Sequence, residues 1–199
     1  LATSSAASDV YKRQYLGGHS DIVGGSIVIK ENKEYAEKIS YIQNAVGAIP
    51  SPFDCYLLTR SIKTLSVRMK QHNENAIAVS NFLTNHSKIN KVFFPGIDER
   101  YKEVAAKQMD GFGGMMSFIL DTNIDGVKSF LKNLNIFTLA ESLGGVESLI
   151  EHPAIMTHAS IDPSIREKLG ISDTLLRISV GIEDVEDLIA DLDQALSKI

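Results

Sequence analysis

Hydrophobic positions change their spacing several times along the chain, and each spacing predicts a helix or a strand. Apolar residues recur at helical intervals over 31–46, which predicts a helix there. Between Pro52 and Pro95 the chain has no glycine or proline and keeps helical spacing, so we expect one or two long helices. The final stretch, 183–198, predicts a helix with one apolar stripe that buries Leu188, Leu192 and Leu196.

Runs rich in β-branched and other apolar residues predict strands between these helices. The predicted strands cover 22–29, 91–96, 117–120, 136–140 and 175–180, and a further helix is predicted over 125–134. The strand at 175–180 has the strongest pattern. Helices that alternate with short strands place the chain in the α/β or α+β class.

Composition narrows the function classes. Of 199 residues, 44% are hydrophobic and 23% charged, and the net charge is −5. An acidic balance argues against binding to a nucleic-acid backbone. No apolar stretch approaches the roughly 18–20 residues that span a bilayer, so we expect no membrane partner. A single cysteine, Cys55, excludes an internal disulfide, and the histidines lack metal-ligand spacing. We therefore expect no bound metal and a cytoplasmic location.

Arg177 is the most informative single residue, because it lies in the middle of the predicted strand 175–180. A guanidinium keeps its charge, so within an apolar strand it needs an anion. Two kinds of partner are open. One is a carboxylate of the same protein, such as Glu141 or Glu147. The other is the carboxylate or phosphate of a ligand, held by two parallel hydrogen bonds.

A second candidate is the segment Glu141-Ser142-Leu143-Gly144-Gly145, which directly follows a predicted strand. Its glycine pair permits positive φ angles or backbone N–H groups that face an anion. A polar turn at the end of a strand explains the same pattern equally well. From the residues alone we expect an α/β protein, with an anion-binding enzyme as one of the open interpretations.

Several segments together resemble one known family. They are 51–56, 63–69, 94–96, 139–149, 153–160 and 177–184. In this order they closely resemble the Cys/Met metabolism family of enzymes that depend on pyridoxal phosphate (PLP). That family includes the cystathionine γ-synthases and γ-lyases. The resemblance runs from Tyr15 to the C-terminus and corresponds to the later half of a family member.

The resemblance implies an α/β fold of the type I PLP-transferase kind, similar to aspartate aminotransferase, present in part. Residues 15–65 would be the remnant of the large PLP-binding domain, and 66–199 a complete C-terminal α+β domain with a largely antiparallel sheet. Residues 1–14 show no helical or strand period and are expected to be a disordered or non-native leader. The parent protein is expected to be a homotetramer.

The resemblance also implies roles for three residues. Arg177 matches the arginine that clamps the α-carboxylate of the amino-acid substrate. Ser142 matches a residue beside that carboxylate, and Glu141 a residue linked to the choice of substrate. The implied reaction is γ-elimination or γ-replacement on sulfur-containing amino acids or activated homoserine, with PLP as cofactor.

One position departs from the family pattern. Gln14 stands where family members carry the lysine that forms the Schiff base with PLP. An amide offers no nucleophilic amine. Lys12 lies two residues earlier, roughly 6–7 Å away in an extended chain. The chain as written is therefore expected not to catalyse the reaction by itself.

Two alternatives stay open beside this interpretation. The chain could be a non-catalytic folding or oligomerisation fragment. It could also be an unrelated anion-binding α/β protein. That last alternative expects an internal carboxylate on Arg177 and no open pocket beside Ser142.

Overall fold

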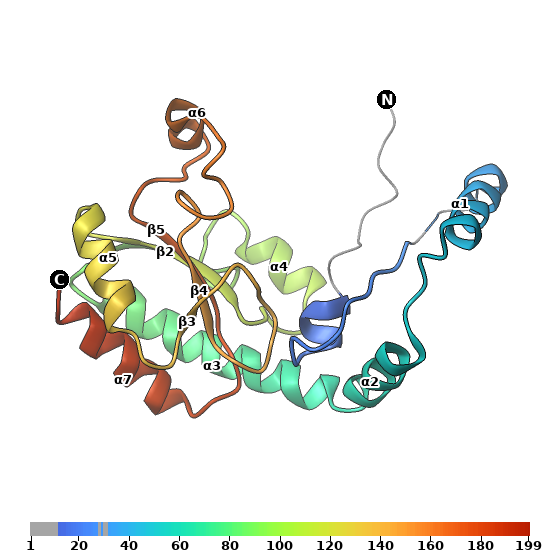
Figure 1. Cartoon of the computed structure of the whole chain (residues 1–199). Coiled ribbons are helices and arrows are strands. Elements are labelled where there is room, and N and C mark those ends of the chain that lie inside the picture. The colour runs from blue at the N-terminus through green and yellow to red at the C-terminus, as the bar shows by residue number, and fades with distance from the viewer. Residues whose placement is uncertain (1–11, 28, 30–31) are drawn as a thin grey trace. The chain divides into compact units, whose positions relative to one another are not determined.

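The computed structural model describes residues 12–27, 29 and 32–199. It divides into two compact units, Leu1–Leu65 and Ser66–Ile199 (Figure 1). Most of the expected leader, residues 1–11, lies outside the described residues. Its last positions belong to a short π-helical turn, η1 (Lys12–Leu16).

The first unit is built from helices and extended loops. Helix α1 (Lys33–Val46) begins after Asn32, whose side chain accepts a hydrogen bond from the Tyr35 N–H at 3.1 Å. The helix ends at Gly47, which takes the left-handed conformation that glycine favours (φ 73°). The predicted helix over 31–46 is thus confirmed.

The strand predicted over 22–29 is wrong. Residues 21–27 and 29 form no strand, and residue 28 lies outside the described part of the chain. A strand requires a neighbour that accepts and donates its backbone hydrogen bonds. No described residue of the first unit forms a strand that could serve as that neighbour.

Two helices fill most of the stretch between Pro52 and Pro95, as predicted. Helix α2 (Pro52–Ile62) begins with Ser51, whose Oγ accepts from the Asp54 N–H at 3.0 Å, and with a proline in its first turn. Helix α3 (Leu65–Asn85) follows after the short break at Lys63.

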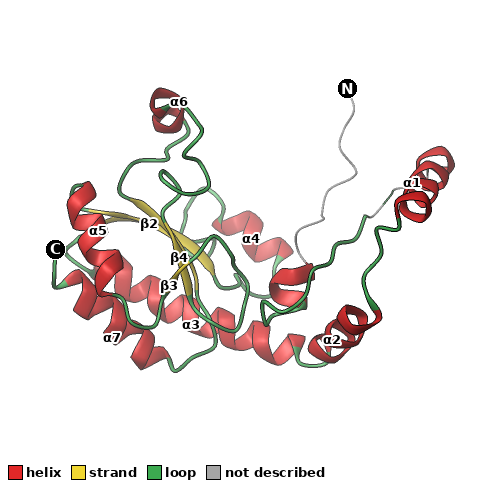
Figure 2. Cartoon of the chain, viewed as in Figure 1, coloured by secondary structure: helices red, strands yellow, loops and turns green. Residues whose placement is uncertain are grey.

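The second unit contains a five-stranded mixed sheet, whose strands are yellow in Figure 2. The strand order is β1-β2-β5-β4-β3. Its strands are β1 (Ile89–Phe93), β2 (Met115–Leu120), β3 (Thr138–Leu139), β4 (Leu149–Glu151) and β5 (Leu175–Ser179). All neighbours are antiparallel except β3 and β4. The strand predicted over 136–140 shrinks to two residues, and β4 was not predicted, because three residues are too few to show a period.

Helices α4 (Lys102–Gln108), α5 (Ile124–Asn133), α6 (Pro163–Lys168) and α7 (Val185–Leu196) complete this unit. Helix α5 confirms the prediction over 125–134, and α7 that over 183–198. Helices α4 and α6 were not predicted. Each is short and mostly exposed, so its sequence shows no recurring apolar positions.

One face of the sheet carries the core. Leu176 and Ile178 of β5 point into it and are 0% exposed, as strand alternation requires. Helices α3, α5 and α7, which are labelled in Figure 1, contribute buried side chains to the same cluster. The predicted burial of Leu188, Leu192 and Leu196 on α7 is confirmed. Arg177 of β5 alternates with these residues and therefore lies on the opposite face of the sheet.

Candidate functional site

A row of polar side chains crosses the second face of the sheet. Arg177 of β5 is the Cα partner of Ser117 on β2 and of Glu151 on β4. Paired residues on neighbouring antiparallel strands point to the same side. These three side chains therefore share the face opposite Leu176 and Ile178.

Arg177 makes two contacts, both through Nη2. It forms an ion pair with Glu151 Oε2 and donates a hydrogen bond to the backbone oxygen of Glu141 at 2.9 Å. The Arg177 side chain is 26% exposed, whereas that of Glu151 is 1% exposed. The ion pair thus joins a buried carboxylate to a guanidinium that reaches toward solvent.

An internal carboxylate on Arg177 was one of two open expectations, but the residue that supplies it was not foreseen. The sequence pointed to Glu141 or Glu147. Glu141 contributes its backbone oxygen instead, and its side chain is exposed. Glu151 supplies the carboxylate. The only local signal was an acidic residue directly after the apolar pair at 149–150.

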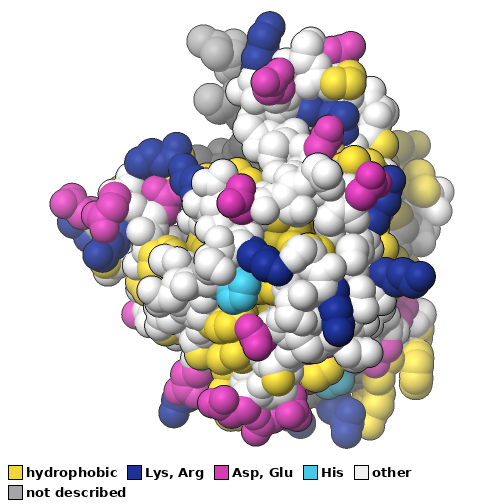
Figure 3. Space-filling model, turned by 90° about the vertical axis from the view of Figure 1, so that its left-hand side faces the viewer, with side chains coloured by type: hydrophobic (Ala, Val, Ile, Leu, Met, Phe, Trp, Pro, Cys, Tyr) yellow, Lys and Arg dark blue, Asp and Glu magenta, His cyan; other side chains and the backbone are white. Residues whose placement is uncertain are grey.

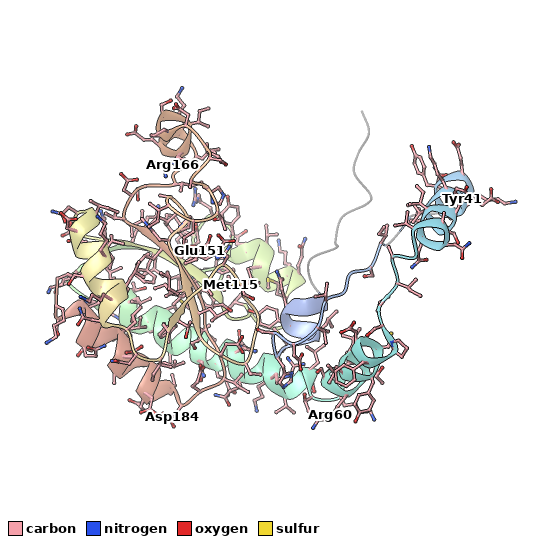
Figure 4. The ribbon with its side chains drawn as sticks, in the orientation of Figure 1. Tyr41, Arg60, Met115, Glu151, Arg166 and Asp184 are labelled. Carbon is pink, nitrogen blue, oxygen red and sulfur yellow. The ribbon has the colours of Figure 1, made fainter. Side chains whose placement is uncertain are left out.

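A fourth polar side chain extends the cluster beyond Glu151, whose place at the sheet is labelled in Figure 4. Thr157 Oγ1 donates a hydrogen bond to Glu151 Oε1. The same Oγ1 lies 2.7 Å from His158 Nδ1. Each carboxylate oxygen of Glu151 therefore meets a different polar partner, Arg177 at one oxygen and Thr157 at the other.

Strand β5 also holds the glycine turn that follows β3. The Gly144 N–H donates to the buried Ser179 Oγ at 2.8 Å. Arg177, two residues earlier on the same face, holds the backbone oxygen of Glu141. Gly144 has a φ of +75°, which is one of the two conformational uses that this glycine pair permits. Ser142 lies between these two contacts and its side chain is exposed.

A set of partly and fully buried hydrogen bonds holds the far end of this turn. The Ser148 N–H and Oγ donate to the two carboxylate oxygens of Glu183 at 2.6 and 2.8 Å. The Gly181 N–H donates back to Ser148 Oγ at 2.8 Å. Asn75 of α3 donates to the backbone oxygens of Gly181 and Glu183. The turn therefore rests on rigid elements at both ends, which is how a binding group keeps its geometry.

The chemistry of this cluster is that of carboxylate recognition. Arg177 has five donor hydrogens in a planar fork. Its Nε and Nη1 form no hydrogen bond to any described residue. These donors and the exposed Ser142 hydroxyl suit a carboxylate that arrives from solvent.

Gln14 lies in η1 of the first unit. Its backbone is distorted there (φ −77°, ψ −122°), and its carbonyl accepts a hydrogen bond from the Gly18 N–H at 2.6 Å. An amide side chain cannot condense with an aldehyde. This position therefore does not fit a covalently attached carbonyl cofactor.

The described ranges contain neither a metal-binding cluster nor a membrane-spanning helix. Within them, no group of three histidine, cysteine or acidic side chains is placed to hold a metal ion. None of the described helices is both long and apolar enough to cross a membrane. Basic and acidic side chains are interspersed on the face of the molecule seen in Figure 3.

Known proteins resemble the chain over nearly its whole length. Residues 11–197 match the family described as Cys/Met metabolism PLP-dependent enzyme. The chain belongs to this family, and PLP is the cofactor of the family. Membership excludes the alternative that the chain is an unrelated anion-binding protein. The internal carboxylate that this alternative expected on Arg177 is nevertheless present, at Glu151.

Individual relatives carry names from cystathionine metabolism. The chain is 53% identical over 186 residues to a cystathionine gamma-lyase of Dictyostelium discoideum, covering 93% of the chain and 48% of the relative. It is 52% identical over 184 residues to a cystathionine beta-lyase of Coxiella burnetii, with 92% and 48% covered. The chain thus spans about half the length of these relatives.

A solved structure shares the fold. Cystathionine gamma synthase from Xanthomonas oryzae pv. oryzae, in complex with cystathionine, superimposes with a TM-score of 0.86 at 46% identity. The match covers 94% of this chain and 48% of that one. This likeness confirms the α/β class and the partial type I PLP-transferase fold.

Proposed function

We propose that this chain is part of a PLP-dependent transsulfuration enzyme. The whole protein would act on sulfur-containing amino acids or activated homoserine by γ-elimination or γ-replacement. Family membership supports the reaction class. The observation that carries the proposal for the site is Arg177, partly exposed on the sheet face and braced through one nitrogen, with its other donors directed to no described residue.

Three residues divide the task of binding the substrate. Arg177 holds the α-carboxylate through its planar fork, which orients the amino acid as well as attracting it. The exposed Ser142 hydroxyl donates a further hydrogen bond to that carboxylate. Glu141, whose backbone oxygen touches Arg177, carries a side chain that influences which substrate is accepted.

The chain alone is proposed to be catalytically incompetent. Gln14 stands at the position of the family lysine and cannot make the covalent link to PLP, so no step through the cofactor is derived for these residues. Residues 15–65 are assigned to the large cofactor domain and 66–199 to the C-terminal domain. The complete protein is proposed to be a cytoplasmic homotetramer.

The test uses the longer protein in which this chain is joined to an upstream half like that of its relatives, with lysine restored at position 14. Purified protein loaded with PLP is assayed with L-cystathionine for release of thiol and keto acid, and with activated homoserine and cysteine for cystathionine. We expect Arg177→Ala to lower kcat/KM by about 100-fold, mainly through KM.

A serine outside the site provides the matched control for Ser142. Ser164 on α6 is also exposed, and its hydroxyl donates to Asp162 at 2.6 Å. We expect Ser142→Ala to lower kcat/KM by several fold and Ser164→Ala to leave it unchanged. Absence of carbon–sulfur chemistry in the unmutated protein would refute the proposed function.

A further inference from the structure

We propose that Glu151 is a positioning residue for Arg177: it holds the inner side of the guanidinium so that the remaining donors face the carboxylate of the substrate. This inference rests on the proposed function. It adds a residue that never touches the substrate and acts only through Arg177.

The sheet itself sets the distance between the two side chains. Glu151 on β4 and Arg177 on β5 are Cα partners in an antiparallel ladder. Side chains at such positions have Cβ atoms about 4.5–5.5 Å apart and cannot drift independently, because backbone hydrogen bonds fix the strands. The ion pair is therefore built into the register of β4 and β5.

The two side chains of the ion pair differ in burial. Glu151 is 1% exposed and Arg177 is 26% exposed, so the carboxylate anchors the guanidinium from the protein side. Removing the positive partner of a buried carboxylate is strongly destabilising, because it leaves a buried charge unpaired. Arg177 meets one oxygen and Thr157 the other, which leaves Glu151 little freedom to turn.

The contacts of Arg177 leave a defined part of its fork for a ligand. Nη2 bonds both Glu151 and the backbone oxygen of Glu141. Nε and Nη1 are the donors not used by described residues. A long arginine side chain has many rotamers, and two contacts on one nitrogen select among them before the substrate arrives.

Positioning and simple electrostatics predict opposite results when the charge of Glu151 is removed. If Glu151 only neutralised Arg177, its loss would strengthen the attraction for an anionic substrate. If Glu151 positions Arg177, its loss lets the guanidinium move and weakens binding. The sign of the change in KM therefore separates the two.

The experiment compares variants in the longer PLP-loaded protein described above. Glu151→Gln is expected to raise KM for cystathionine about tenfold, with a smaller change in kcat. Glu151→Asp should recover part of the loss, because it restores the charge. Thr157→Val should shift KM in the same direction by less. The matched control, Asp191→Asn, removes another buried carboxylate on α7 and should lower stability without raising KM.

A second measurement needs no activity and uses the 199-residue chain itself. The Arg177 Nη2 hydrogens, which belong to the nitrogen that contacts Glu151, are assigned by comparison with Arg177→Lys, and their exchange with water is followed by NMR. We expect exchange at least several fold faster in Glu151→Gln than in the unmutated chain or in Asp191→Asn. This readout also serves if Glu151→Gln cannot be loaded with PLP.

The outcomes separate the two proposals. If the unmutated protein shows no carbon–sulfur chemistry, the proposed function fails, and the NMR comparison still judges the link between Glu151 and Arg177. If the unmutated protein is active and Glu151→Gln leaves KM unchanged or lowers it, the positioning role is overturned. Unchanged exchange at Arg177 overturns it as well.

Discussion

Helices α1 and α7 show how differently the two units use the same sequence pattern. Both carry apolar residues at helical spacing, and both begin with a side-chain cap. Yet α1 has no buried residue, while α7 buries five. On α1, Tyr41 and Val46 are each 73% exposed, whereas Leu188 on α7 is 0% exposed. Periodicity thus predicts a helix, but burial depends on a surface that the helix can cover.

The largest expected difference between the units comes from truncating one apolar side chain in each. Leu192→Ala on α7 should lower the free energy of unfolding of its unit by about 3 kcal/mol, since it opens a cavity in a packed core. Ile42→Ala on α1 removes a side chain that is 50% exposed. This substitution should change the free energy of unfolding by less than about 0.5 kcal/mol. Urea unfolding followed by circular dichroism measures both, and similar losses would contradict the contrast.

Asp191 of α7 makes a second core contribution that has no counterpart on α1. Its carboxylate is 4% exposed and accepts from the backbone N–H groups of Asn135, Ile136 and Phe137 at 2.8–3.1 Å. Asp191→Asn should lower the free energy of unfolding by about 1–3 kcal/mol, because those donors lose a charged acceptor. Asp125→Asn, at an exposed carboxylate on α5, is the control and should have almost no effect.

The same carboxylate makes stability depend on pH. Burial raises the pKa of Asp191, but the hydrogen bonds from Ile136, Asn135 and Phe137 outweigh burial and leave the pKa below its ordinary value. A depressed pKa contributes stability above the unfolded pKa of about 3.9 that is lost as pH falls through the folded pKa. Asp191→Asn should therefore flatten the loss of stability below about pH 4. The measurement is the free energy of unfolding in urea at several pH values. An equally steep loss below about pH 4 in Asp191→Asn and in the unmutated chain would contradict the prediction.

The N-terminal caps of α1 and α7 extend the comparison of the two units to smaller changes in stability. Asn32 caps α1 and Asp184 caps α7, each through a side-chain oxygen that accepts a backbone N–H. Replacement by alanine should cost about 1 kcal/mol of helix stability at either place. For Asp184→Ala we expect this loss in the unfolding of the whole unit. For Asn32→Ala we expect only faster local hydrogen exchange within α1, because no core depends on that helix.

The smallest expected effect is a null result with PLP. Added to the 199-residue chain, PLP should form no single stoichiometric adduct, because Gln14 cannot condense with an aldehyde. Lysine amines exposed to water are protonated at neutral pH, so they should react weakly and without selectivity. Borohydride trapping and peptide mapping give the readout. One stoichiometric adduct, at Lys12 for instance, would contradict the proposed incompetence of the chain.

Much of the second unit could be predicted from local patterns. The apolar stripe on α7 identified Leu188, Leu192 and Leu196 as core residues, because residues at this spacing lie on one face of a helix. Strand alternation placed Leu176 and Ile178 in the core and Arg177 on the other face. The roles of Arg177, Ser142 and Glu141 in binding a substrate stay predictions.

What the sequence determined by itself was local: helix periods, strand faces, and a glycine turn that takes a positive φ at Gly144. The tertiary structure decided which segments became neighbours. It left residues 22–27 and 29 without a strand partner. It also set the three-residue strand β4 beside β5, so that the carboxylate paired with Arg177 is that of Glu151 and not that of Glu141 or Glu147. The physical reason is that a period reports which face of an element is apolar, whereas an ion pair requires two chain segments to meet in register, which only the assembled sheet specifies.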